Sequence, residues 1–190
     1  MKTAIPTRTL VLAALMLNLG VAGAYAQQNV KMTFSGTNVA LPINLLANTV
    51  TDETHLAGVG SLGPFTFREL HADGAAAAPP SGCLGPYFGV LKGAGVFQFP
   101  DESLLIVTVV DGSGCINPAA GKATLIVNYR VGGGTGRFTG ATGNLTMTAT
   151  IMPVLFNGAN PAAPALLTNT GKFEGTVLRS AGRDDDEDEQ

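Results

Sequence analysis

Hydrophobic and polar side chains alternate along most of the chain after residue 26. Two stretches, VKMTFS at 30–35 and ATLIVNYRV at 123–131, place apolar side chains at every second position. The same period recurs in NLTMTATI at 144–151 and in GKFEGTVL at 171–178. A period of two predicts strands with one buried side and one side in water. Threonines are frequent on the polar side, as is common on the wet faces of strands.

One stretch, SLLIVTVV at 103–110, is almost continuously apolar. This pattern predicts a central strand that is covered on both faces. Pro100-Asp101-Glu102 before it predicts a tight turn, and the DGSG that follows Val110 predicts another turn that closes the strand.

The remaining segments are expected to be connections. Residues 72–82 and 156–170 are rich in small residues and proline, which predicts two long loops that serve either as lids or as variable surface. A short helix is an alternative for residues 42–53, but no segment after residue 27 has a persuasive helical period. Seven or eight strands at short spacing predict an all-β domain, either an antiparallel barrel or a β-sandwich.

The glycine-rich stretch VGGGTGRFTGATGN at 131–144 needs its own interpretation. A phosphate-binding loop would need a lysine after its glycines and a helix behind them, whereas here a strand pattern follows. The glycines therefore predict a turn or bulge that uses positive φ angles. Arg137 within it is expected to bond local carbonyl groups, with anion binding as the alternative. The G-x-G-x-x-G match at 58–63 also precedes a strand pattern, so no dinucleotide site is expected.

The segment RVGGGTGRFTGATGNLTMTAT at 130–150 resembles a glycine-rich segment of dirigent proteins and a similar turn of allene oxide cyclases. It is also similar to small exported bacterial proteins of unknown function that carry G-T-G-R-F-x-G-A-T-G after an F-x-F-P-D-G-S-L-type turn. This chain has FQFPDESLL there, with Glu102 in place of the glycine. The resemblance covers roughly residues 56–178 and implies an antiparallel barrel of eight strands. It transfers no working residue to this chain.

The two ends of the chain differ from the rest. Residues 1–26 have a basic start, an apolar stretch and the cleavage pattern Ala24-Tyr25-Ala26, which predicts a signal peptide and a secreted or periplasmic protein beginning at Gln27. The alternative is an N-terminal membrane anchor. Residues 27–180 are expected to form a single domain, and residues 181–190 a disordered acidic tail.

Charge and composition exclude some partners. Residues 27–183 carry nine basic and eight acidic side chains, which gives no basic patch for nucleic acid. No later apolar stretch is long enough for a membrane helix, so no membrane association is expected once the signal is cleaved.

The chain has two cysteines, Cys83 and Cys115. In an oxidising compartment two lone thiols are expected to pair, and a disulfide here would stabilise the fold by about 3–4 kcal/mol. The alternative is two separate buried thiols. Neither cysteine has a second Cys or His at ligand spacing, so no metal site is predicted.

The candidate catalytic residues are Glu69 and His71. In FTFRELH they share one strand face with Phe65 and Phe67, and a carboxylate beside an imidazole provides an acid–base pair at a barrel rim. The alternative is an exposed strand end with an incidental ion pair. His55, beside Asp52 and Glu53, is interpreted as turn polarity rather than as a metal site. No cofactor motif is present.

Two functions follow from these observations. The first is a non-enzymatic exported barrel that binds a small apolar ligand inside or is purely structural. The alternative is a cofactor-free enzyme of the cyclase or dirigent kind that guides a reactive intermediate by the shape of its cavity. The ligand and the oligomeric state are left open by the sequence.

Overall fold

The computed structural model describes residues 25–41, 43–157 and 160–180. Most of the predicted leader and the whole acidic tail lie outside these residues. The described chain contains eight strands and two short 3₁₀ turns: β1 (Tyr25–Leu41), β2 (Val50–Gly60), β3 (Phe65–Gly74), β4 (Tyr87–Gln98), β5 (Leu104–Asn117), η1 (Pro118–Ala120), β6 (Lys122–Gly134), η2 (Gly136–Phe138), β7 (Thr142–Asn157) and β8 (Asn160–Ser180).

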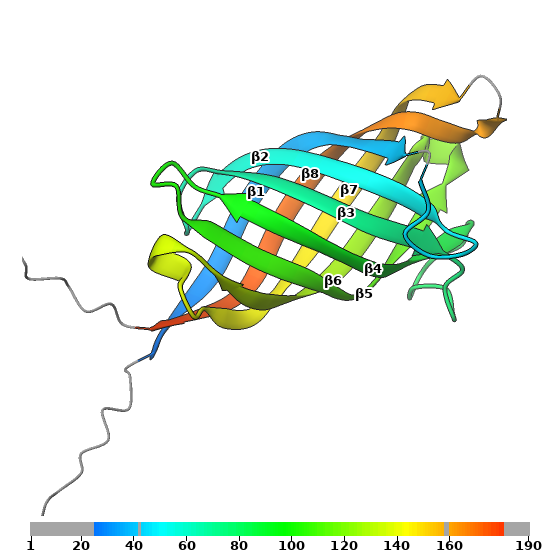
Figure 1. The fold of residues 1–190 in the computed structure, drawn as a ribbon. Helices are drawn as coiled ribbons and strands as arrows, with labels where there is room; N and C mark the ends of the chain where they lie inside the picture. Colours follow the sequence, from blue (N-terminus) through cyan, green and yellow to red (C-terminus); the bar gives the residue numbers. More distant parts are fainter. Residues whose placement is uncertain (1–24, 42, 158–159, 181–190) are drawn as a thin grey trace, which may run out of the picture.

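The strands form one closed antiparallel barrel in sequence order (Figure 1). Each strand pairs with the next, and β8 returns to pair with β1 from Tyr25↔Ser180 to Val39↔Leu166. The predicted eight-stranded barrel is therefore confirmed, and the sandwich alternative is not formed. Closure leaves no unpaired sheet edge. Tyr25 and Ala26, which fall within the predicted leader, form the first rungs of the β1–β8 ladder.

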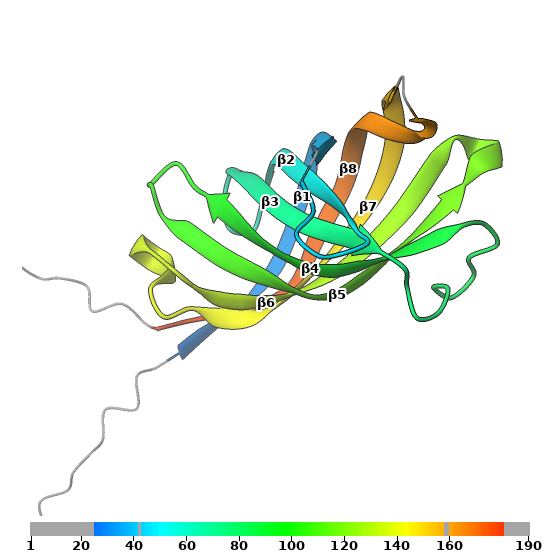
Figure 2. The ribbon, with the colours of Figure 1, turned by 45° about the vertical axis from the view of Figure 1, so that its right-hand side comes forward.

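The two ends of the barrel are different. The described ends of β1 and β8 nearest the termini lie at one end, together with the β2–β3, β4–β5 and β6–β7 connections (Figure 1). The β1–β2 and β3–β4 connections lie at the other end, together with the β5–β6 and β7–β8 hairpins, which project from it (Figure 2). We call these the terminal end and the open end.

Alternate side chains fill the middle of the barrel, as the period of two predicts. The inward set of β1, β6, β7 and β8 is 0–6% exposed and comprises Val30, Met32, Phe34, Leu125, Val127, Tyr129, Val131, Leu145, Met147, Ala149, Ile151, Phe173 and Val177.

Aromatic rings form the centre of this core. The ring centroids of Phe67 and Phe97 are 4.4 Å apart, and those of Phe97 and Phe173 are 4.9 Å apart. The ring of Phe67 lies over Gly95, where an added Cβ would come within 2.5 Å of it. Glycine in β4 thus makes room for an interior ring.

The prediction for residues 103–110 was wrong in two respects. Leu105 and Val107 are fully buried, but Ile106 is 39% and Val110 is 48% exposed. A barrel wall is a single sheet, so the outer side of β5 has no second layer to cover it. The predicted turn after Val110 is also absent, because β5 continues to Asn117 through a register shift between Val109 and Asp111. A bulge of this kind lets a strand continue past residues that signal a turn.

The described part of residues 156–170, predicted to be a loop, instead extends the β7–β8 hairpin up to the Asn157↔Asn160 pair. Three register shifts in β7 between Pro153 and Asn157 accommodate the prolines of this hairpin, because a bulge tolerates a residue without an N–H group. The other predicted loop, residues 72–82, is confirmed only from residue 75 onward, because Ala72, Asp73 and Gly74 instead continue β3. Residues 43–49 form turns, and no helix is present in the described part of 42–53.

The glycine-rich stretch closes the terminal end. Gly136, with φ +55°, begins the turn η2, and the β5–β6 register shifts opposite Gly132, which confirms the predicted turn and bulge. Arg137 donates from Nη2 to the carbonyl of Leu62 at 2.8 Å. Its guanidinium also lies 4.7 Å and 4.9 Å from the ring centroids of Phe99 and Phe138. Arg137 therefore bonds a carbonyl group, but one 75 residues earlier in the chain rather than a local one as expected. Its guanidinium covers the rings of Phe99 and Phe138 at this end.

Replacing Arg137 with lysine is expected to lower the free energy of unfolding by about 1–2 kcal/mol, because an ammonium group stacks less well on rings and loses the planar donor geometry. Urea unfolding followed by circular dichroism would measure the loss. Arg130→Lys, on the exposed side of β6, is the matched control and should leave the midpoint unchanged. Equal midpoints for the two variants would contradict this role of Arg137.

The predicted disulfide is present between Cys83 and Cys115, whose Cα atoms are 5.7 Å apart. It joins the β3–β4 connection to the end of β5, at the open end. Replacing both cysteines with alanine is expected to lower the free energy of unfolding by about 3–4 kcal/mol, because the unfolded chain regains the entropy of a 32-residue loop. Unfolding of this variant should no longer respond to reductant, whereas a reductant-independent wild type would contradict the prediction.

Candidate functional site

The open end of the barrel holds a cavity of about 820 Å³. Its wall is mostly apolar and includes Val50, Phe88, Leu125, Ile151 and Leu167. Polar residues also line it, among them Asn38, Asp52, His71 and Asp73, and Asn48, Thr49, Asn117 and Lys122 complete the polar lining. A concave apolar site of this volume with a few convergent polar groups is typical of small-molecule binding sites in proteins.

Two adjacent strands bring the ionisable groups to this cavity. The alternation of β3 turns Phe65, Phe67, Glu69, His71 and Asp73 inward, in order from the aromatic core to the cavity. Asp52 of β2 is the register partner of His71 of β3. Cross-strand partners project from the same face of a sheet, so the Asp52 carboxylate lies beside the imidazole.

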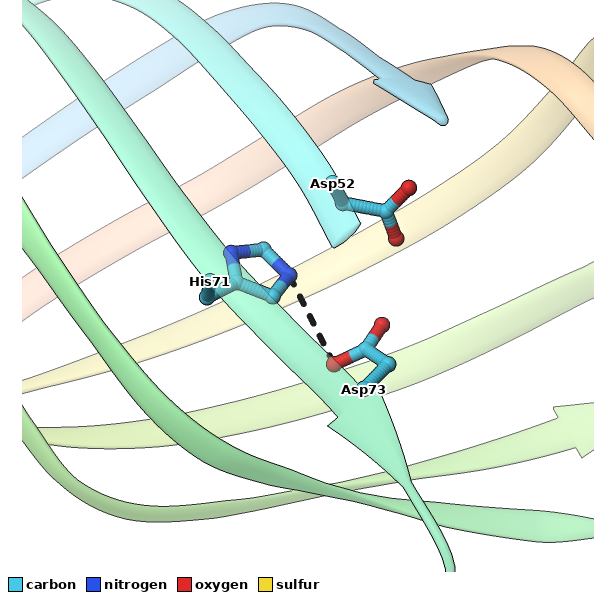
Figure 3. A group of neighbouring side chains, drawn as sticks. All are labelled: Asp52, His71 and Asp73. Carbon is cyan, nitrogen blue, oxygen red and sulfur yellow. Dashed lines mark ion pairs between the residues drawn. The ribbon is translucent and has the colours of Figure 1, made fainter. Parts of the chain in front are cut away.

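The three side chains at the cavity form a compact group (Figure 3). One ligand atom from each of Asp52, His71 and Asp73 lies within 4.8 Å of the others. His71 Nε2 is 3.6 Å from Asp73 Oδ1. We call these three residues the rim cluster.

A second polar layer lies beneath the rim cluster. His71 Nδ1 is 3.5 Å from Glu69 Oε2, and the same oxygen accepts a hydrogen bond of 3.0 Å from the Tyr129 hydroxyl. Glu69, His71 and Tyr129 are only 1–2% exposed. A chain of polar contacts therefore runs from the aromatic core to the cavity wall.

Burial and neighbouring carboxylates set the charge of these groups. Burial of the Asp52 carboxyl, together with the nearby Asp73 carboxylate, raises its pKa from 3.8 to about 7, although His71 partly opposes this. Burial alone would lower the pKa of His71, but Asp73 and Glu69 outweigh it and hold that pKa well above 6.5. Burial, and then the Glu69 carboxylate, raise the pKa of Tyr129 well above 10.

The sequence-predicted pair is brought together, but its two members have different positions. Glu69 and His71 share the inward face of β3, as expected, and the alternative of an exposed strand end is wrong because both are buried. His71 lines the cavity, whereas the Glu69 side chain lies beneath it. A catalytic role for either residue stays a prediction.

Three residues of the site were missed or misassigned. Asp73 was placed in the predicted loop 72–82, although the alternation of β3 continues to it and could have identified it as inward. Asp52 was grouped with His55 as turn polarity, yet it faces inward while His55 Nε2 contacts Glu53 Oε1 at 2.7 Å on the outer side. Tyr129 was predicted to be inward, but nothing in the sequence shows that it meets Glu69, 60 residues earlier.

The comparisons with known proteins return no match: no protein-family model, no curated protein and no solved structure is significantly similar to the chain. The barrel is therefore established by the strand pairing of this chain alone. Across residues 25–41, 43–157 and 160–180, no helix is long and apolar enough to cross a membrane. The disulfide is compatible with an extracellular or periplasmic location.

Proposed function

We propose that this protein is an exported β-barrel that binds a small, mainly apolar molecule in the cavity of its open end. The observation that carries the proposal is the contrast between the two halves of the barrel. Aromatic and aliphatic side chains fill the terminal half, whereas the open half contains a cavity of about 820 Å³. A purely structural barrel of eight strands has room to fill its interior with side chains throughout.

The polar groups of the cavity indicate which kind of molecule fits. Asp73 Oδ1 is buried and has no hydrogen-bond partner among the described residues. An unsatisfied buried acceptor is costly, so a ligand hydroxyl or amine that donates to it would be favoured. The expected ligand has an apolar body and one end that donates hydrogen bonds.

Export is part of the same proposal. The leader pattern of residues 1–26 and the disulfide at the open end support a secreted or periplasmic protein. The resemblance to dirigent proteins and allene oxide cyclases supports a ligand inside the barrel, and the resemblance to the small exported bacterial proteins supports export.

Native mass spectrometry of the protein purified from its own host tests the proposal. The wild type should carry a co-purified small molecule. Ala123→Phe should lose it, because Ala123 lines the cavity and a phenyl ring there would occupy the space of the ligand. Ala57→Phe makes the same change on the exposed side of β2 and should keep the ligand. A bare wild-type protein that also takes up nothing from a lipid or phenolic extract of the host would contradict the proposal.

A second candidate function is a cofactor-free enzyme of the cyclase or dirigent kind. The observation that favours it is that an imidazole and two carboxylates reach the wall of the cavity, where general acid–base groups would have to be. Incubation with a host metabolite extract separates the two functions by stoichiometry. A binding protein removes at most one equivalent of a compound and releases it unchanged on denaturation, whereas an enzyme converts many equivalents.

A further inference from the structure

We propose that the rim cluster binds one divalent transition-metal ion, with Zn²⁺ as the best-fitting ion. The ligands would be carboxylate oxygens of Asp52 and Asp73 and Nε2 of His71. Within the described part of the chain, this is the group of three His, Cys, Asp or Glu side chains close enough to share an ion. The inference goes beyond organic ligand binding and does not depend on it.

The donor set selects the class of ion. Two carboxylate oxygens and one imidazole nitrogen suit Zn²⁺ and its neighbours in the first transition row, whereas Mg²⁺ and Ca²⁺ prefer oxygen ligands only. Three protein ligands with a fourth position left open is the arrangement of zinc sites that bind an exchangeable group.

The spacing of the donors also fits. His71 Nε2 and Asp73 Oδ1 are 3.6 Å apart, which is too long for a hydrogen bond. Two ligands each about 2.1 Å from one zinc ion would subtend about 120° at that separation, close to the tetrahedral angle. Small rotations of the Asp52 side chain, which is at the cavity rather than in the packed core, would bring its carboxylate to the same ion.

An independent observation is the state of His71. The side chain is 1% exposed, and Nδ1 has no hydrogen-bond partner among the residues that the structure describes. The other nitrogen faces Asp73 Oδ1, which is also buried and without a hydrogen bond (Figure 3). Buried polar atoms are rarely left unpaired, and an ion bound by His71 Nε2 and Asp73 Oδ1 would give that carboxylate oxygen a partner.

The layer beneath the rim cluster has the form expected behind a metal-binding histidine. Such a histidine nearly always turns its other nitrogen to a carboxylate or carbonyl, which fixes the ring. Glu69 Oε2 lies 3.5 Å from His71 Nδ1 and is itself held by the Tyr129 hydroxyl. Glu69 is therefore assigned as a positioning residue rather than as a ligand.

Access and the open position agree with this assignment. All three ligand residues line the cavity of about 820 Å³, so an ion has an entry path from the open end. The fourth position would point into the same cavity, where water or a polar group of a bound molecule would complete the coordination.

The test is Zn²⁺ binding to the full chain after treatment with a chelator, measured by competition with a chromophoric zinc indicator. The wild type is expected to bind one equivalent. Asp52→Asn is the main variant, because Asp52 lies at the cavity and its replacement spares the core; the affinity should fall by more than about 100-fold, since a lost ligand costs more than a lost second-layer contact. His71→Ala should do the same if it folds.

Two further variants separate this site from incidental binding. Glu69→Gln should weaken Zn²⁺ by about 10–100-fold and alter the visible spectrum of bound Co²⁺, because the imidazole loses its charged partner. His55→Ala removes the other described histidine, which pairs with Glu53 on the outer side, and should leave the affinity unchanged.

Three results would overturn the inference. They are the absence of stoichiometric binding to the wild type, full affinity in Asp52→Asn, and a loss in His55→Ala instead. Weak binding by the acidic run at 184–189 would survive Asp52→Asn and is distinguished in that way. Organic ligand binding is tested independently of the metal site by native mass spectrometry with chelator present.

Discussion

Replacing Phe173 with alanine is expected to lower the free energy of unfolding by about 3–5 kcal/mol, the largest loss for a side chain of the aromatic core. The Phe173 ring is the hub of this core. Its centroid is 4.9 Å from those of both Phe34 and Phe97, and 5.2 Å from that of Phe67. Truncation would leave a cavity that rings on four strands cannot easily fill, because each is fixed by its own neighbours.

Urea unfolding of two variants with progressively smaller side chains, Phe173→Leu and Phe173→Ala, would measure this effect. The leucine variant should lose less, because it keeps most of the buried volume. Lys172→Ala, one residue away on the exposed side of β8, is the matched control and should change stability little, since its contact with Glu174 is a surface ion pair. A loss below about 1 kcal/mol would show that the terminal half is not packed around this ring.

Replacing Glu69 with alanine is expected to lower the free energy of unfolding by about 3–5 kcal/mol, because it removes one carboxylate partner of the buried His71 and leaves the Tyr129 hydroxyl without its acceptor. Its side chain is fully buried, contacts His71 at 3.5 Å and accepts the Tyr129 hydroxyl bond. The variant would leave an imidazole and a phenol facing an empty, apolar space.

The free energy of unfolding should be measured with chelator present, so that the loss of a bound ion does not contribute to the difference between variant and wild type. Glu69→Gln is the matched control, since its carbonyl oxygen still accepts from Tyr129 and only the charge is lost. It should therefore be more stable than Glu69→Ala. A Glu69→Ala variant as stable as the wild type would mean that the contacts of Glu69 with His71 and Tyr129 contribute nothing to the stability of the folded protein.

These two predictions concern different halves of one barrel. Aromatic rings fill the terminal half, and Arg137 covers the rings of Phe99 and Phe138 at its end. This half therefore stabilises the fold. The open half carries buried polar atoms without partners and a cavity. Sites that bind ligands commonly contain such locally unfavourable features, and the packed remainder of the domain tolerates them.

The local sequence pattern was sufficient to predict which side chains point inward where a strand has one side in water and one buried side. The inward positions of β6 and β7, and the placement of Glu69 and His71 on one face of β3, follow from a period of two. The same reasoning misled at residues 103–110, where outward valines and isoleucines imitate a strand buried on both sides. It misled again at 156–170, where proline and glycine signalled a loop but bulges let the hairpin continue.

By itself, the sequence determined that the chain is all-β, which side chains of β1, β6 and β7 point inward, and that any disulfide within the chain joins Cys83 to Cys115. These are local properties, because alternation depends on neighbours along the chain and two cysteines leave one pairing. Only the tertiary structure decided that β2 and β3 pair with Asp52 opposite His71, that Tyr129 reaches Glu69, and that one end of the barrel is left hollow. Register and filling are set by contacts between distant segments, and a pattern read along one strand contains no information about the strand beside it.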